Sequence, residues 1–134
     1  MKFTVPGDPK PQGRPRFFRR GAFVGTYDPK DSASFKQKVG FYAVEAGMTL
    51  SDGPLALSAK FYIKRPKNRC RSKDDRGAIV CSKRPDLDNL VKAILDGLNG
   101  IAFKDDGQVC VMELRKFYHE VDKAQRTEIE ILPI

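Results

Sequence analysis

An amphipathic segment spanning residues 88 to 99 constrains the fold of this chain more than any other feature. Its apolar residues recur at helical spacing, and they are Leu90, Val91, Ile94, Leu95 and Leu98. Asp88 stands where the helix would begin, and Asn99-Gly100 forms a stop signal because both residue types tolerate left-handed backbone. The pattern predicts a helix with one apolar face, which needs a sheet or another helix to cover it.

The patterns on either side of this segment predict the remaining elements. Helical spacing begins near Ser32 and ends near Gly47. Four further segments read as strands, namely residues 2–6, 55–63, 108–118 and 126–134, and the last two are expected to form a closing hairpin. The order β-α-β-α-β-β predicts an α/β (α+β) fold with a mixed sheet packed by two helices. A length of 134 residues fits one domain covering residues 1–134.

The net charge of +8 is unevenly distributed along the chain. Residues 1–30 carry seven Lys/Arg against two acids, residues 60–84 ten against two, and residues 85–134 six against ten. Two basic loops are predicted, at about residues 7–21 and 64–84, and GAIV in the second could pair as a short strand. Such clusters suit a nucleic acid. DNA contacts are therefore expected from Lys10, Arg14, Arg16, Arg19, Arg20, Arg69, Arg71, Lys83 and Arg84.

Hydropathy and cysteine usage disfavour several classes of protein. No window approaches the roughly 18 apolar residues of a membrane span and no apolar region follows the N-terminus, so a cytoplasmic protein is expected. Neither basic segment has the helical periodicity of a membrane-surface anchor. Three cysteines without an export signal favour reduced thiols over disulfides. Cys70 and Cys81, with His119, lack close CxxC pairing, so the pattern disfavours zinc.

Acidic residues border the predicted helix in this otherwise basic chain, and they are Asp86, Asp88, Asp105 and Asp106. One explanation is structural. Asp88 would cap the helix, Asp86 would belong to the preceding turn, and Lys92 would be the i,i+4 partner of Asp88. Asp105-Asp106 would then be a turn before a strand.

The other explanation of these acids is a metal site. Hard cations such as Mg²⁺ take oxygen ligands, usually from one to three carboxylates plus water and substrate phosphate. Asp86, Asp88 and Asp106 could converge if the strand after Gly107 runs beside the start of the helix. The residue pattern alone leaves both explanations open.

The motif PDLDNLVKAILDGLNG, followed by KDDGQV, resembles the signature of the RusA family of Holliday junction resolvases, many of them encoded by phages and prophages. The resemblance extends over about residues 1–134, and its specific part is residues 85–109. The long insert around Cys70 to Cys81 departs from the family pattern.

This resemblance implies a role for individual residues. The family's DxDNxxxK and DDxQ elements supply catalytic metal ligands, which here are Asp86, Asp88 and Asp106. Lys92 matches the family's lysine and is implied as a catalytic residue that holds the scissile phosphate or stabilises developing charge. The supporting residues are Asn89 and Asp105.

The implied function is a Mg²⁺-dependent endonuclease, with Mn²⁺ as an alternative metal, that resolves four-way DNA junctions in recombination and repair. Resolution needs two symmetric nicks and one chain carries one such set of acids, so a homodimer is expected. No small-molecule cofactor is expected, and the location would be the cytoplasm of a bacterial cell, with a phage or prophage gene. Two alternatives stay open: a non-enzymatic basic DNA-binding protein, and a nuclease for other branched DNA.

Overall fold

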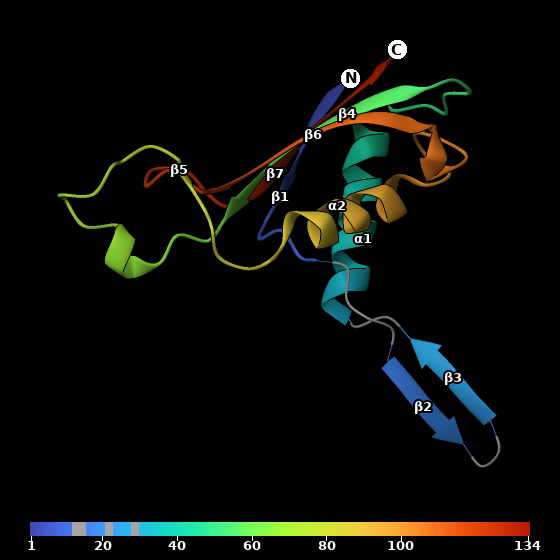
Figure 1. The fold of residues 1–134 in the computed structure, drawn as a ribbon, viewed down its shortest axis with the longest axis horizontal. Helices are drawn as coiled ribbons and strands as arrows, with labels where there is room; N and C mark the ends of the chain where they lie inside the picture. Colours follow the sequence, from blue (N-terminus) through green and yellow to red (C-terminus); the bar gives the residue numbers. More distant parts are fainter. Residues whose placement is uncertain (12–15, 21–22, 28–29) are drawn as a thin grey trace.

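A five-stranded mixed sheet is the central layer of the fold (Figure 1). The computed structural model describes residues 1–11, 16–20, 23–27 and 30–134, and side chains are described for residues 1–11 and 34–134. The strands lie in the order β1 (Lys2–Pro6), β7 (Arg126–Pro133), β4 (Leu55–Ile63), β6 (Val109–Tyr118), β5 (Ile79–Val80). Strands β4 and β6 are parallel, and every other pair in this sheet is antiparallel. The predicted mixed sheet is confirmed, and so is the short GAIV strand, as β5.

Both α-helices of the described chain lie on the same face of this sheet (Figure 1). Helix α2 (Leu87–Leu98) begins and ends within one residue of its prediction, and Gly100 follows it with a φ of 82°. The sequence makes Ser32 or Asp31 the expected N-cap of the first helix. Helix α1 (Lys30–Glu45) begins earlier, so both residues lie inside it and this prediction is wrong. In the described part of the chain, neither helix is long and apolar enough to cross a membrane.

The core lies between the helices and the sheet, as the alternation of residues 55–63 predicts. Leu57 pairs with Ile131 and Ala59 with Ile129, and all four side chains are buried on the helix side. Helix α2 covers them with the apolar face expected from its spacing. Its buried residues are Leu90, Val91, Ala93, Ile94 and Leu98.

The predicted closing hairpin is wrong. Strands β6 and β7 are consecutive, yet β4 lies between them and pairs with both. The segment from residue 119 to 125 is long enough to cross one intervening strand, since adjacent strands are only about 4.8 Å apart. Strand β6 is parallel to β4 because the chain returns through α2 before entering it, whereas β7 pairs antiparallel on the other side.

The first predicted basic loop, residues 7–21, is also partly wrong. Strand β2 (Arg16–Arg20) pairs antiparallel with β3 (Phe23–Tyr27) in a separate two-stranded sheet. Phe, Val and Tyr have high strand propensity: β2 contains two Phe, and β3 contains Phe, Val and Tyr. The high Arg content of β2 hid this signal. Arg14, expected to contact DNA, lies outside the described residues, and the side chains of Arg16, Arg19 and Arg20 do too.

The two helices approach closely because glycine stands at their crossing. A Cβ atom on Gly97 would lie 2.8 Å from the backbone oxygen of Lys36 and 3.0 Å from Cβ of Val39. Gly40 of α1 faces the same contact, since its Cβ would lie 3.2 Å from the Gly97 oxygen. An ion pair of 3.6 Å between Lys36 and Asp96 borders the crossing. The crossing fixes how α2, and hence its acidic start, sits on the sheet.

Gly97→Ala should therefore destabilise the protein by about 1–3 kcal/mol, because the added methyl group forces the helices apart. In an exposed helix the same change would raise the free energy of unfolding by about 0.5–1 kcal/mol. The sign of the measured change therefore shows whether the added methyl group is crowded at the crossing. Urea unfolding followed by circular dichroism measures the change. Gly53→Ala is the matched control, since nothing lies within 4 Å of its Cβ position. Equal stability of both variants would show that the crossing tolerates a side chain.

Candidate active site

The first pair of predicted site acids lies at the start of α2. Asp86 occupies the N-cap position, where its carbonyl accepts a hydrogen bond of 3.1 Å from the N–H of Leu90. Its carboxylate makes no capping hydrogen bond. Asp88 lies inside the first turn and is exposed, so its predicted role as the cap is wrong. Capping therefore does not explain why these two carboxylates are present, although a negative charge in the first turn suits the helix dipole.

Two further predicted residues, Asn89 and Lys92, are exposed on the same helix. If the acids had only a structural role, Lys92 was predicted to form an ion pair with Asp88. Among the described residues, Lys92 forms no salt bridge within 4.0 Å. Its ammonium group is thus available to a ligand at the start of α2.

The second pair of acids lies in a 3₁₀ turn, η2 (Asp106–Gln108), that precedes β6. Asp105 is its N-cap, and Oδ1 of Asp105 accepts a hydrogen bond of 3.0 Å from the N–H of Gly107. This bond from the N–H of Gly107 is the main cause that holds the pKa of Asp105 below its ordinary value. Asp106 is exposed and forms no ion pair in the described part of the chain. The two neighbours therefore differ: Asp105 closes the turn, and Asp106 presents a carboxylate to solvent.

Gln108 holds this turn in place. Its Oε1 accepts hydrogen bonds from the N–H groups of Lys104 at 2.9 Å and Asp105 at 3.2 Å, which completes a capping box. Its Nε2 donates to the carbonyl oxygens of Ser51 at 2.7 Å and Gly53 at 3.1 Å, before β4. The D-x-x-Q spacing that signals a capping box was visible in the sequence, but no structural role had been assigned to Gln108.

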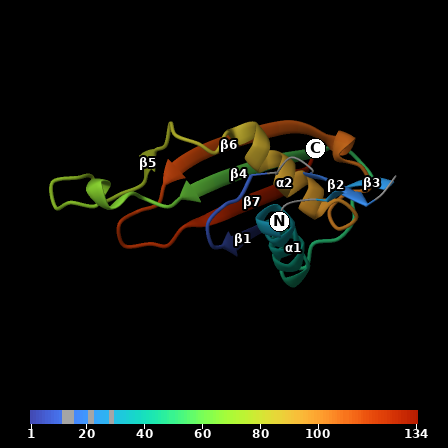
Figure 2. The ribbon, with the colours of Figure 1, turned by 90° about the horizontal axis from the view of Figure 1, so that it is seen from below.

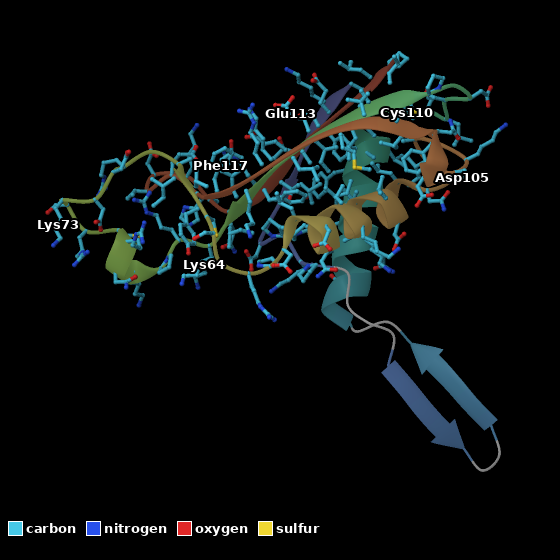
Figure 3. All side chains as sticks on the ribbon, viewed as in Figure 1. Lys64, Lys73, Asp105, Cys110, Glu113 and Phe117 are labelled. Atoms are coloured by element: carbon cyan, nitrogen blue, oxygen red, sulfur yellow. The ribbon has the colours of Figure 1, made fainter. Side chains whose placement is uncertain are left out.

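The structure does not bring Asp106 to Asp86 and Asp88 within one chain. A helix of twelve residues such as α2 is about 18 Å long. Asp86 shares a groove with Leu114–Phe117 of β6, whereas Asp106 precedes Val109 at the other end of that strand. Figure 3 shows the neighbouring Asp105 beyond the far end of α2. No three His, Cys, Asp or Glu side chains of the described residues are grouped to hold a metal ion, and this includes Cys70, Cys81 and His119.

A second groove of about 380 Å³ borders Asp86 on the side of the N-terminal segment. It is lined by Lys10 and Arg84, which were both predicted to contact DNA, together with Asp86 and Asn89. Asp8 also lines it and was missed by sequence reasoning. Its Oδ1 is buried without a described hydrogen-bond partner, and the carboxylate pairs with Lys10 at 3.5 Å. Two basic residues from segments far apart in sequence, Lys10 and Arg84, thus lie in the same groove as Asp86.

The second basic loop, residues 64–84, has a polar centre of its own, which the sequence did not predict. The buried guanidinium of Arg65 donates to the carbonyl oxygens of Arg69 at 2.6 Å and Gly77 at 2.9 Å, and also to that of Asp75. The loop includes a 3₁₀ turn, η1 (Lys67–Arg69), and projects beyond the sheet with Lys73 near its tip (Figure 3). Its basic side chains are exposed apart from Arg65, namely Lys64, Lys67, Arg69, Arg71, Lys73, Arg76, Lys83 and Arg84.

Exposed carboxylates at a helix start, bordered by folded basic segments on an α+β scaffold, are typical of a protein that acts on nucleic acid. The family model described as endodeoxyribonuclease RusA matches residues 6–132, so the chain belongs to the RusA family of endodeoxyribonucleases. The chain is also similar to the uncharacterized protein YqaN of Bacillus subtilis (strain 168), at 37% identity over 131 residues, which cover 93% of this chain and 92% of that protein. Family membership implies the endonuclease activity of a Holliday junction resolvase, with branched DNA as its substrate.

Gln108→Ala should lower stability by about 1–3 kcal/mol, because it leaves the N–H groups of Lys104 and Asp105 without their acceptor. Differential scanning calorimetry gives the change, and hydrogen exchange should localise the lost protection to residues 104–108. Gln125→Ala, which changes the same residue type in the turn before β7, is the control. Unaltered exchange at residues 104–108 would mean that the turn holds its shape without Gln108.

Proposed function

We propose that this protein is a metal-dependent endonuclease that resolves four-way DNA junctions by two symmetric nicks and acts as a homodimer. The observation that carries the proposal is the family match, combined with exposed carboxylates at Asp86, Asp88 and Asp106 that capping does not explain. A bacterial cytoplasm, in a cell that carries the gene on a phage or prophage, is the proposed location. No small-molecule cofactor is proposed.

Mg²⁺, or Mn²⁺ with similar oxygen ligands, is the proposed cofactor. Such an ion supplies a nucleophilic water at neutral pH and neutralises charge that develops on the phosphate. Asp86 and Asp88 lie close together in sequence and offer the hard oxygen donors that these ions prefer. Within one chain, however, Asp106 does not fit the same ion as Asp86, because the length of α2 separates them.

Lys92 is proposed to hold the scissile phosphate. It lies one helical turn beyond Asp88 and is exposed, with no ion pair to a described acid. An ammonium group is a point charge that suits a phosphate oxygen, and its effect increases when water is excluded by bound DNA.

The basic segments are proposed to supply affinity for the junction. Lys10 and Arg84 lie in the groove beside Asp86, and the projecting loop of residues 64–84 extends the basic surface away from it. Phosphate contacts of this kind are independent of sequence. They would offset the repulsion between DNA and the acids.

Asp86→Asn and Asp106→Asn test the proposal, since each removes one carboxylate charge and keeps the shape of the side chain. Each variant should lose cleavage of a labelled four-way junction in Mg²⁺ by at least about a hundredfold. In EDTA each should bind the junction at least as tightly as the parent protein, because one repulsive charge is gone. Melting temperatures should stay within a few degrees.

Asp122→Asn is the matched control, because Asp122 is an exposed acid in the turn before β7. Parallel assays on flap and linear duplex DNA report substrate choice. Parent-like cleavage by both site variants would remove the proposed active site. Equal cleavage of all three DNA substrates would instead show that the protein is a general nuclease and not a junction resolvase.

Lys92→Ala should fold normally and cleave the junction at least about tenfold more slowly, as expected for losing one charge that stabilises the transition state. Single-turnover cleavage rates measure this effect without a contribution from product release. Lys92→Arg should recover part of the rate, because it restores the charge. A normal rate for Lys92→Ala would leave this lysine with a surface role only.

A further inference from the structure

The part of the second basic loop that precedes β5, residues 64–77, is called the basic arm below. It carries seven Lys/Arg against two acids. The arm leaves the sheet after β4 and extends beyond the ends of β4 and β6, away from α2 (Figure 2). It overlaps the long insert that departs from the RusA family pattern, so family membership does not explain its shape.

A buried guanidinium group holds the basic arm together. Arg65 is only 3% exposed. Its N–H groups donate to the carbonyl oxygens of Arg69 at 2.6 Å, of Gly77 at 2.9 Å and of Asp75. A further bond, of 3.5 Å, reaches the carbonyl oxygen of His119, just after β6. Arg65 therefore joins the two halves of the arm to each other and to the end of the sheet.

Other contacts fix the arm against β6 and the turn that follows it. The N–H of Val121 donates to the carbonyl oxygen of Arg76 at 3.0 Å. The guanidinium carbon of Arg69 lies 6.0 Å from the centroid of the Tyr118 ring, within the range of a cation–π contact. The last part of β6 also borders the groove beside Asp86. The direction of the arm is therefore fixed relative to the proposed active site.

Both acids of the arm close its turns. Asp74 accepts hydrogen bonds from the backbone N–H of Arg71 at 2.8 Å and from Nε of the same residue at 3.4 Å. The bond from the backbone N–H is the main cause that holds the pKa of Asp74 below its ordinary value. Oδ1 of Asp75 accepts a bond of 2.9 Å from the N–H of Gly77. The acids thus shape the backbone, and the basic side chains that surround them are exposed, namely Lys64, Lys67, Arg69, Arg71, Lys73 and Arg76.

The charge at the centre of the arm is not neutralised by an acid of the described chain. Arg65 forms no salt bridge within 4.0 Å among the described residues, and its acceptors are uncharged carbonyl oxygens. Carbonyl oxygens replace the hydrogen bonds of lost water but leave the positive charge in place. The arm therefore keeps a formal charge of +5, from seven Lys/Arg and two acids. A rigid surface of this charge suits the phosphates of DNA.

The place of the arm favours a duplex other than the one that is cut. Lys10 and Arg84 line the groove at Asp86, between the N-terminal segment and the start of α2. The arm projects from the end of the sheet, so it is a separate basic surface (Figure 1). A four-way junction has duplexes that leave the crossover in different directions, whereas a linear duplex has one direction only. Two basic surfaces in a fixed relation therefore suit a branched substrate.

We propose that Arg65 is a positioning residue for the recognition of branched DNA. It holds the basic arm rigid, and the arm binds the phosphate backbone of a second duplex of the junction, outside the duplex that is cut. The inference rests on the proposed function, because it concerns the same DNA substrate. Arg65 is buried and contacts no phosphate, so it acts through the exposed basic side chains around it.

Arg65→Lys tests the positioning role without a change in net charge. Lysine carries its three donors on one nitrogen, so it cannot bond all the carbonyl oxygens that surround the planar guanidinium group. Hydrogen exchange should show lost protection in residues 66–77 and unchanged protection in α2. In gel shifts with EDTA, binding to a labelled four-way junction should weaken at least about fivefold, and binding to a linear duplex of equal length should stay nearly constant.

Arg65→Met is the second variant, because it removes every donor and keeps an apolar stem in the buried site. It should lose junction selectivity to the same degree. Lys60→Met is the matched control, since Lys60 is an exposed lysine of β4 outside the arm. This control removes one charge and should leave the ratio of the two DNA affinities as it is in the parent protein.

Lys67→Ser combined with Lys73→Ser tests the surface that Arg65 positions. Both lysines are exposed, so exchange protection of the arm should match that of the parent protein. The salt slope of junction binding should fall by about 0.9 for each lost phosphate contact. Hydroxyl-radical footprinting should show protected backbone on a duplex that the parent protein does not cut, and this protection should disappear in the double variant.

Unchanged junction selectivity in both Arg65 variants would overturn the inference and leave Arg65 with a structural role alone. Intact exchange protection of the arm in these variants would also overturn it. So would an equal loss of affinity for the junction and the linear duplex, because the arm would then supply only unspecific charge. A parent protein whose junction selectivity depends on the arm, but which does not cut junctions in Mg²⁺, would instead overturn the proposed function alone.

Discussion

The parallel pairing of β4 with β6 is the constraint on which the rest of the structure depends. Parallel strands need a crossover, and the chain between β4 and β6 supplies it through the basic loop and α2. The helix returns antiparallel to β6, because it must bring the chain back to the end of the sheet where β4 begins. Its start is therefore beside the end of β6, and its end leads to the turn before β6. The separation of Asp86 from Asp106 follows from this geometry.

Helix α2 keeps its place through apolar packing, which leaves its polar residues free for other roles. Its buried face contacts the sheet. On another side, Gly97 has no side chain, so the backbone of α1 at Lys36 can lie directly against it. Asp88, Asn89 and Lys92 take no part in that packing and are exposed. Mutations of these polar residues should thus affect chemistry more than stability, whereas changes at the glycine crossing should do the reverse.

The sequence predicted the features that depend on local periodicity. The spacing of apolar residues predicted helix α2 and strands β1, β4, β6 and β7, because the backbone period of each element sets that spacing. The mixed sheet follows from the order of these elements. Strand order was predicted less well, because nothing local shows that β4 comes between β6 and β7. The centre of the second basic loop was missed because a buried Arg65 has no distinctive sequence signal. The hypothesis that Asp106 reaches the helix start needed the direction of β6 relative to α2, which is a tertiary property.

The DDxQ element shows how one short motif serves both structure and chemistry. Asp105 and Gln108 close the turn, and Gln108 also ties it to the carbonyl groups of Ser51 and Gly53, ahead of β4. The carboxylate of Asp106 is therefore held in a fixed relation to the start of both parallel strands. Strand β6 begins directly after this turn, so the pairing of β6 with β4 and the hydrogen bonds of Gln108 together fix the backbone that carries Asp106. A substitution at Gln108 would therefore disturb the position of the Asp106 carboxylate, whereas a substitution of Asp106 itself removes no contact that holds the turn.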